Sequence, residues 1–168
     1  MIIPAKLARH LLVLRLATSQ YEFSMKVDIR NRKASFTYFL GDEYVAGIQL
    51  LGCEIKSIRH GKASIAEGYC RFHKKELYIF NMHVEPYANA GHVVPLPRRE
   101  RKLLLKHSEL NKLRRKLRDV GVTLVPLHLF ISDSGYAKLK IAVAKGKKLH
   151  DKRHAIKERD QQRDLDRR

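Results

Sequence analysis

The stretch from Val122 to Ala144, VTLVPLHLFISDSGYAKLKIAVA, is typical of a β-hairpin. In its second half Leu139, Ile141 and Val143 alternate with polar or small residues, which is the two-residue period of a strand with one buried face. The polar residues 132–135 supply the turn between the two strands. Pro126 has no backbone N–H to donate, so we expect it at a sheet edge or a bulge.

Upstream residues predict more strands of the same kind. Residues 35–51 alternate well enough for a strand with a bend at Gly41 or Gly47. Residues 66–86 predict a second hairpin, with strands at 69–72 and 77–80 and a polar turn at 73–76. Several short strands with one or two helices indicate a mainly β protein, namely a small antiparallel barrel of the oligonucleotide-binding (OB) type with flanking short helices.

Two segments have the spacing of helices. Residues 52–60 place Ile55 and Ile58 three apart, and Gly61 is suited to end that short helix. After a loop rich in proline and glycine at 86–97, Ser108 is expected to cap the second helix and Gly121 to end it. The apolar face expected for this second helix consists of Leu110, Leu113, Leu117 and Val120.

Length and composition predict one folded domain with two extensions. The 168 residues are 44% apolar, which is enough for one core without metals or disulfides. Met25 opens a polar stretch that looks like a natural N-terminus, so we expect residues 1–24 to be an extension without function and residues 25–144 to be the OB-type domain. Residues 145–168 contain too few apolar side chains to bury, so we expect this basic tail to be disordered when free.

The sequence gives little support for catalysis or a membrane. Cys53 and Cys70 form no zinc-ligand set or disulfide framework, which favours a reducing, cytoplasmic compartment. No run reaches the roughly eighteen apolar residues of a membrane span. His83 and Glu85 are thin evidence for a metal-dependent nuclease, and no phosphate-binding glycine loop or nucleophile elbow is present. We therefore expect a protein that is not an enzyme and has no catalytic residues, no metal and no cofactor.

Charge points to a polyanionic partner. Lys and Arg number 35 against 17 Asp and Glu, a formal net charge of +18. Residues 98–118 hold ten basic and two acidic residues, which indicates a phosphate-binding surface. A solvated helix face is the better explanation for any one of these residues, but it explains the cluster as a whole less well. A second basic concentration, AKGKKLHDKR, covers residues 144–153. Nucleic acid is the first partner to test, with acidic lipid as a less favoured alternative.

Five blocks of sequence carry a resemblance to a known family. They are NRKA at 31–34, AGIQLLGCEIKSIRHGKA at 46–63, NMHVEPY at 81–87, RKLLL at 101–105 and AKGKKLHDKRHAIKERD at 144–160. Their order and spacing resemble those of the bacterial SsrA-binding proteins, over about residues 31–168. The resemblance implies an OB-type barrel that binds transfer-messenger RNA (SsrA RNA) and delivers it to stalled ribosomes, the process called trans-translation.

The resemblance also implies which residues contact RNA. On the barrel, the residues implied to face transfer-messenger RNA are Asn31, Lys33, Lys56, Arg59, Lys62, Lys102 and Leu104. For Leu104, a place in the core is a strong alternative. In the tail, the residues implied to enter the ribosome are Lys145, Gly146, Lys147, Lys148, His150, Asp151, Lys152 and Arg153. His150 is implied to stack in the decoding centre, although a lone histidine is more often an ordinary surface residue, and the tail is implied to occupy the empty messenger channel. We also expect the protein to be a monomer when free, with no membrane partner.

One position departs from the family pattern. Val45 stands where the family usually has a glutamate, so any RNA contact or internal ion pair of that carboxylate is in doubt. The alternative function is a non-catalytic ribosomal protein or a general RNA chaperone. It has the same charge and fold, so only partner selectivity distinguishes it.

Overall fold

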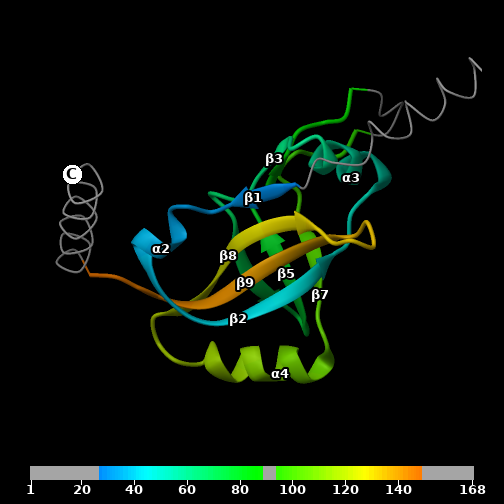
Figure 1. The fold of residues 1–168 in the computed structure, drawn as a ribbon. Helices are drawn as coiled ribbons and strands as arrows, with labels where there is room; N and C mark the ends of the chain where they lie inside the picture. Colours follow the sequence, from blue (N-terminus) through cyan, green and yellow to red (C-terminus); the bar gives the residue numbers. More distant parts are fainter. Residues whose placement is uncertain (1–26, 89–93, 149–168) are drawn as a thin grey trace, which may run out of the picture.

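The computed structural model describes residues 27–88 and 94–148, and it is mainly β (Figure 1). Its strands are β1 (Asp28–Arg30), β2 (Tyr38–Ile48), β3 (Ala63–Ser64), β4 (Tyr69–His73), β5 (Glu76–Phe80), β6 (His83–Val84), β7 (Arg101–Leu104), β8 (Val122–Ile131) and β9 (Ala137–Gly146). Its helices are α2 (Ala34–Thr37), α3 (Gly52–Arg59) and α4 (His107–Lys116). The predicted fold class is confirmed.

The strands close into an antiparallel barrel. The order in the main sheet is β1-β8-β4-β5-β7-β2-β9, and an additional pairing of β9 with β8 completes a ring from β8 back to itself. Strand β1 pairs with β8 at residues 128–130, beyond the point where Leu124 of β8 pairs with Cys70 of β4. Strands β3 and β6 form a separate two-stranded sheet.

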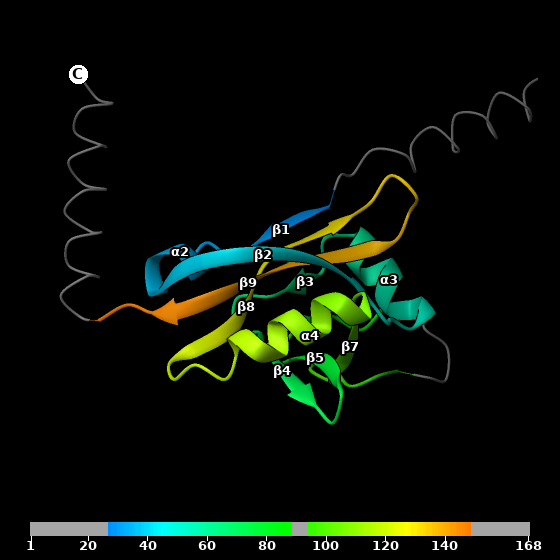
Figure 2. The ribbon, with the colours of Figure 1, turned by 90° about the horizontal axis from the view of Figure 1, so that it is seen from below.

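The inward-facing side chains of the barrel form the main core. Leu77, Ile79, Leu103, Leu124 and Leu139 are completely buried there. Helix α4 lies across one end of the barrel (Figures 1 and 2) and adds Leu110 and Leu113 to the same core. Burial of these side chains removes apolar surface from water, which is the dominant force that holds the barrel closed.

The predicted hairpins are confirmed in both position and irregularity. The register of β8 on β9 shifts between Pro126 and His128, where a bulge was expected. Strand β2 bends at a second bulge between Leu40 and Glu43, next to Gly41. A Cβ at Gly41 would lie 3.3 Å from the carbonyl oxygen of Val143, so the strand crosses β9 too closely for a larger residue to fit without a shift.

Two predictions at helix ends are wrong. Helix α4 begins one residue before Ser108, and its first turn is satisfied by the Glu109 carboxylate, which accepts the backbone N–H of Lys106 at 2.9 Å. The helix ends at Lys116, so Val120 lies beyond it and is 96% exposed instead of completing the apolar face. The expected strand at 35–51 is shorter in the structure: helix α2 occupies its start, with Ala34 packed in a small cluster with Val125 and Ala144, and β2 ends at Ile48.

The barrel also extends past the expected boundary at residue 144. Strand β9 continues to Gly146, and its last residues, Lys145 and Gly146, pair with Phe39 and Tyr38 of β2. The backbone N–H of Lys147 then donates to the carbonyl oxygen of Thr37 at 3.0 Å. Lys145, Gly146 and Lys147 therefore make ordered contacts with the folded domain, contrary to the disorder predicted for the start of the tail. The rest of that tail, residues 149–168, lies outside the described residues.

The core predicts the cost of a cavity. Leu139→Ala removes a completely buried side chain from β9, so we expect the free energy of unfolding in urea to fall by about 2–5 kcal/mol. Val120→Ala, at the exposed end of the α4 segment, is the control and should change it by no more than about 0.5 kcal/mol. Equal losses for the two variants would contradict this description of the core.

Candidate RNA-binding surface

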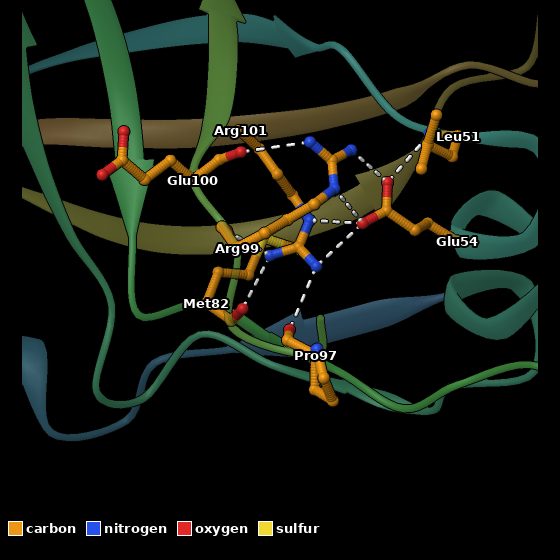
Figure 3. Close-up of polar contacts among 7 residues, drawn as sticks. All are labelled: Leu51, Glu54, Met82, Pro97, Arg99, Glu100 and Arg101. Carbon is orange, nitrogen blue, oxygen red and sulfur yellow. Dashed lines mark hydrogen bonds and ion pairs between the residues drawn. The ribbon is translucent and has the colours of Figure 1, made fainter. Parts of the chain in front are cut away.

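Helix α3, which carries several of the implied RNA contacts, is held in place by Glu54. The side chain of Glu54 is 2% exposed. One carboxylate oxygen, Oε2, accepts the backbone N–H of Leu51 at 2.8 Å and so closes the first turn of the helix. The same oxygen accepts a hydrogen bond from Nη2 of Arg99 at 2.5 Å. Figure 3 shows the carboxylate between the helix and two arginines, Arg99 just before β7 and Arg101 at its first position.

The second arginine, Arg101, is completely buried and ties four segments together. Its Nε donates to Oε1 of Glu54 at 3.0 Å, and its Nη1 donates to the carbonyl oxygen of Met82 at 2.7 Å (Figure 3). Further donations reach the carbonyl oxygens of Arg99 at 3.0 Å and Pro97 at 3.1 Å. A buried guanidinium with this many acceptors is fully solvated by protein atoms, so α3, β7 and the ends of the 81–97 segment are fixed together.

The electrostatics of this network keep the carboxylate ionised. Burial acts to raise the pKa of Glu54, but the hydrogen bonds from Arg99 and the Leu51 N–H and the charges of Arg101 and Arg99 outweigh it. The net pKa lies below the ordinary glutamate value. Glu54, Arg99 and Arg101 are therefore structural charges, and they are not available to bind RNA phosphates.

Helix α3 and the turn after it present three of the implied contacts. Lys56 lies with its Nζ 5.3 Å from the centre of the Tyr87 ring. Arg59 donates from Nη2 to the carbonyl oxygen of Gly135, in the β8–β9 turn, at 3.2 Å. Lys62 Nζ is 3.2 Å from a carboxylate oxygen of Glu85. All three side chains are exposed, and they share one region of the surface because Lys56 and Arg59 lie on α3 and Lys62 follows it directly.

Two more implied contacts face outward from β7. Leu103 is completely buried whereas Leu104 is 51% exposed, so the core alternative for Leu104 is wrong. Lys102 points to the same side and its Nζ is 3.2 Å from Glu76. Between β7 and α4, a cleft of about 550 Å³ is lined by both residues and by His107 at the start of the helix. The lining also includes Lys106 and the acidic residues Glu76 and Glu109, so the cleft contains charges of both signs next to leucine side chains.

The two implied contacts nearest the N-terminal end of the barrel differ from each other. Lys33 is exposed, and its Nζ lies 3.6 Å from Glu67. Asn31 is only 9% exposed: its Nδ2 donates to the carbonyl oxygen of Pro126 at 3.1 Å, and its backbone N–H donates to that of Leu127 at 2.8 Å. This burial disfavours a direct RNA contact. Asn31 instead anchors the chain after β1 at the bulge of β8.

Strand pairing adds basic residues that the resemblance did not include. Leu104 is opposite Gly47, Gly47 is opposite Lys138, and Lys138 is opposite Phe130. The next row of the outer face contains Val45, Lys140, His128 and Arg30. The alternation of Lys138 and Lys140 with buried residues was visible in the sequence, but only the register shows that they adjoin Leu104 and Val45.

The same rows show how the departure at Val45 is accommodated. Val45 is 47% exposed, and because its side chain is uncharged it needs no charged partner. Lys140, which is opposite Val45, pairs instead with Glu43, at 3.0 Å between Nζ and Oε2. The outer face therefore keeps a carboxylate beside Lys140, supplied two residues earlier on β2.

The basic segment 98–118 does not form a single surface. Arg99 and Arg101 bind the carboxylate of Glu54. Arg114 packs over the Phe72 ring, with 5.2 Å between its guanidinium carbon and the ring centre, and Lys116 pairs with Asp42. The basic residues of this segment that remain exposed are Arg98, Lys106, Lys112, Arg115 and Arg118. Composition alone therefore overstated the segment as a phosphate-binding unit.

The start of the tail lies beside α2. Lys145, Gly146 and Lys148 are exposed at the end of β9 and just after it. Lys147 is half-buried, and its Nζ donates to the carbonyl oxygen of Ser35 at 2.9 Å and lies 5.1 Å from the centre of the Phe39 ring. His150, Asp151, Lys152 and Arg153 lie outside the described residues.

The described part of the chain offers no cluster of metal ligands. Within residues 27–88 and 94–148, no group of three or more histidine, cysteine or acidic side chains is arranged to hold a metal ion. His83 and Glu85 are therefore not part of such a group. The helices of those residues include none that is long and apolar enough to cross a membrane.

The closed antiparallel barrel with exposed lysines and arginines along its outer rows defines an OB-type, nucleic-acid-binding class of protein. The model of one family, described as SmpB protein, matches residues 28–168. The chain belongs to the SmpB protein family.

Curated relatives and a solved structure agree with this assignment. An SsrA-binding protein of Christiangramia forsetii is 55% identical over 141 residues, which are 84% of this chain and 90% of that protein. One from Bacteroides thetaiotaomicron is 51% identical over 139 residues, or 83% and 93%. A solved structure described as "tmRNA-SmpB: a journey to the center of the bacterial ribosome" is similar with a TM-score of 0.62 and 41% identity, and the match covers 73% of this chain and 86% of that one.

The Glu54 network predicts a pH-dependent stability. Glu54→Gln leaves the buried Arg101 and its neighbour Arg99 without their counter-charge, so we expect the free energy of unfolding at pH 7 to fall by about 3–5 kcal/mol. Because the pKa of Glu54 is lowered by folding, its contribution is present above the unfolded value near 4.5 and is lost as the pH falls through the folded value. The difference between wild type and variant, measured by urea unfolding, should therefore shrink below about pH 4.5.

Glu67→Gln is the matched control for this experiment. Glu67 pairs with Lys33 on the surface, with 67% of its side chain exposed, so its loss should cost no more than about 1 kcal/mol. A Glu54→Gln variant as stable as Glu67→Gln would show that the buried network does not support the fold.

Proposed function

We propose that this protein binds transfer-messenger RNA and delivers it to stalled ribosomes for trans-translation. The observation that carries the proposal is the family membership over residues 28–168, together with relatives named SsrA-binding proteins. The structural likeness to a chain from a tmRNA-SmpB structure on the bacterial ribosome supports the same two partners. We also propose that the protein acts in the cytoplasm, as a binding protein without catalytic activity.

The described geometry supports an RNA site spread over one end and one side of the barrel. Lys56, Arg59 and Lys62 are exposed at the α3 end, and Lys102 and Leu104 are directed outward from β7. Cations of this kind neutralise phosphates, while an exposed leucine gives apolar contact to a base or ribose. The Lys138 and Lys140 positions extend this surface across β9.

The role of the tail is a separate part of the proposal. Lys147 and Lys148 begin it at the opposite end of β9 from the β8–β9 turn, next to α2. RNA binding by the barrel and action by the tail on the ribosome are therefore expected to be separable. The family resemblance assigns the tail residues His150 to Arg153 to the ribosome. The cations Lys152 and Arg153 and the planar ring of His150 suit contact with ribosomal RNA.

The alternative function is a ribosomal protein or general RNA chaperone, and selectivity distinguishes it. Binding to transfer-messenger RNA is measured in the presence of excess transfer RNA and ribosomal RNA. We expect binding to survive the competition. Displacement by either competitor would favour the alternative.

The first variant removes the basic side chains at the α3 end. Changing Lys56, Arg59 and Lys62 together to Ala should weaken binding to the tRNA-like part of transfer-messenger RNA at least 10-fold. It should also reduce the slope of log affinity against log salt by about one for each phosphate that the variant no longer neutralises. The circular-dichroism spectrum should stay unchanged because all three side chains are exposed.

A charge-matched triple variant tests whether position or charge matters. Lys112, Arg115 and Arg118 are also exposed and lie in α4 and just beyond it. Their replacement by Ala removes the same charge, and we expect a smaller loss of affinity. Equal losses in the two variants would mean that RNA responds to net charge and that the α3 end is not a specific site.

The second variant separates the tail from the barrel. Because β9 runs to Gly146 and Lys147 contacts Ser35 and Thr37, the chain is best shortened after Lys148. This truncation should leave most of the affinity for transfer-messenger RNA but abolish tagging in a reconstituted translation system with a message that lacks a stop codon. A parallel variant of the full chain replaces His150, Asp151, Lys152 and Arg153 with Ala.

Two outcomes would contradict the tail mechanism. Normal tagging by the truncated protein would show that the tail is dispensable. Equal loss of RNA binding and tagging would place the tail in the RNA site of the barrel instead.

A further inference from the structure

The outer side of the β4–β5 hairpin carries aromatic and basic side chains to which neither the family resemblance nor the comparisons give a role. We name this surface the aromatic face and define it by its residues: Tyr69, Arg71, His73, Tyr78 and Phe80. Cys70, Leu77 and Ile79, which alternate with them, are buried in the core. The strand period therefore directs all five members outward.

The aromatic rings of this face are arranged in two pairs. Tyr69 is directly opposite Phe80, with ring centres 5.4 Å apart and planes 10° apart. His73 and Tyr78 form a second contact, edge to face, with centres 6.0 Å apart. Tyr69 is nevertheless 48% exposed, so much of its surface is available to a further planar group.

Cations lie beside and between these rings. Arg71 is exposed and is opposite Tyr78, and Tyr78 is opposite Lys102 of β7 on its other side. At the β4 edge, Lys33 lies beside Glu67, two residues before Tyr69. The carboxylates next to the face, Glu67 and Glu76, are paired with Lys33 and Lys102, so they do not oppose an anionic ligand strongly.

This combination suits unpaired nucleotides better than a protein or a lipid. Bases of single-stranded RNA stack on tyrosine and phenylalanine rings, and arginine and lysine between the rings hold the phosphates. A protein partner would use a more continuous apolar patch, whereas here a charged residue separates the ring pairs. Cross-strand aromatic pairs also stabilise a hairpin, and an experiment must therefore separate stacking from folding.

We propose that the aromatic face binds unpaired nucleotides of transfer-messenger RNA by stacking on Tyr69 and neutralising phosphates with Arg71. This proposal rests on the proposed function. Transfer-messenger RNA is favoured as the source because Lys33 and Lys102, at the two edges of the face, are among the residues implied to contact that RNA. The aromatic face thus continues the candidate surface around the barrel, from β7 across β5 to β4.

A single tryptophan makes the stacking directly measurable. The chain contains no tryptophan, so Tyr69→Trp introduces one fluorophore on the face. Titration of the full-length variant with the tRNA-like domain of transfer-messenger RNA should quench its fluorescence, because a stacked base quenches indole emission. Val120→Trp places the same fluorophore at a position that is 96% exposed, beyond α4, and should not be quenched.

Affinity provides the second measurement. Tyr69→Leu removes the ring while keeping apolar bulk, and we expect it to weaken binding by about 5-fold to 100-fold, the range for one stacked base. Tyr69→Phe keeps the ring and should bind like the wild type. The thermal unfolding midpoint of each variant shows whether the fold is affected. We expect Tyr69→Leu to lose affinity while its midpoint stays equal to that of the wild type.

Three outcomes would overturn the aromatic face as a site for this RNA. The first is unquenched Tyr69→Trp at saturating RNA, and the second is an unchanged affinity for Tyr69→Leu. The third is quenching by ribosomal subunits or a protein but not by the RNA, which would assign the face to another partner. Each is distinct from failure of the proposed function, in which the wild-type chain itself would show no preference for transfer-messenger RNA.

Discussion

The buried pair of Glu54 and Arg101 is the interaction on which the arrangement of the surface depends. It joins the first turn of α3 to the start of β7 and, through the Met82 and Pro97 carbonyls, to the segments on either side of β6. Breaking a buried ion pair is costly because the remaining charge has no solvent, so this set of contacts strongly favours one geometry. Lys56 and Arg59 on α3 and Lys102 on β7 are displayed on elements that this one network holds together.

Side chains along each barrel strand alternate between the core, where they stabilise the fold, and the outer face, where they are available to bind RNA. Inward positions of β7 and β9, such as Leu103, Leu139 and Ile141, are completely buried. The lysines that alternate with them, Lys102, Lys138 and Lys140, are partly exposed on the outer face. The pairing of β8 with β9 closes a ring of strands, which leaves fewer free edges than an open sheet would present. The exceptions are Arg99 and Arg101, whose charges pair with the buried carboxylate of Glu54.

The sequence predicted most of the fold because its strands have strong two-residue periodicity. The hairpins and the bulge at Pro126 followed from alternation and from the missing N–H of proline. The limits of α4 did not follow, because a glutamate that reaches back to Lys106 competes with the expected cap at Ser108. For the surface, resemblance indicated Lys56, Arg59, Lys62, Lys102 and Leu104, and each is accessible at least in part. The burial of Asn31 depends on how strands pair, and so does the placement of Lys138 and Leu104 on either side of Gly47. The alternation of residues within one strand does not encode this register.

The docking of Lys147 against Ser35 and Thr37 makes the end of the barrel a fixed attachment point for the chain that follows. Residues 149–168 then have a geometric limit: twenty residues span at most about 70 Å when extended and about 30 Å as a helix. When the barrel binds a ligand, this segment is therefore confined to a sphere around Lys147 whose radius is its extended length. Within that sphere the local concentration of the segment near any target is set by chain length and is independent of the amount of protein in solution. The end of β9 and the docked Lys147 therefore set the centre of that sphere.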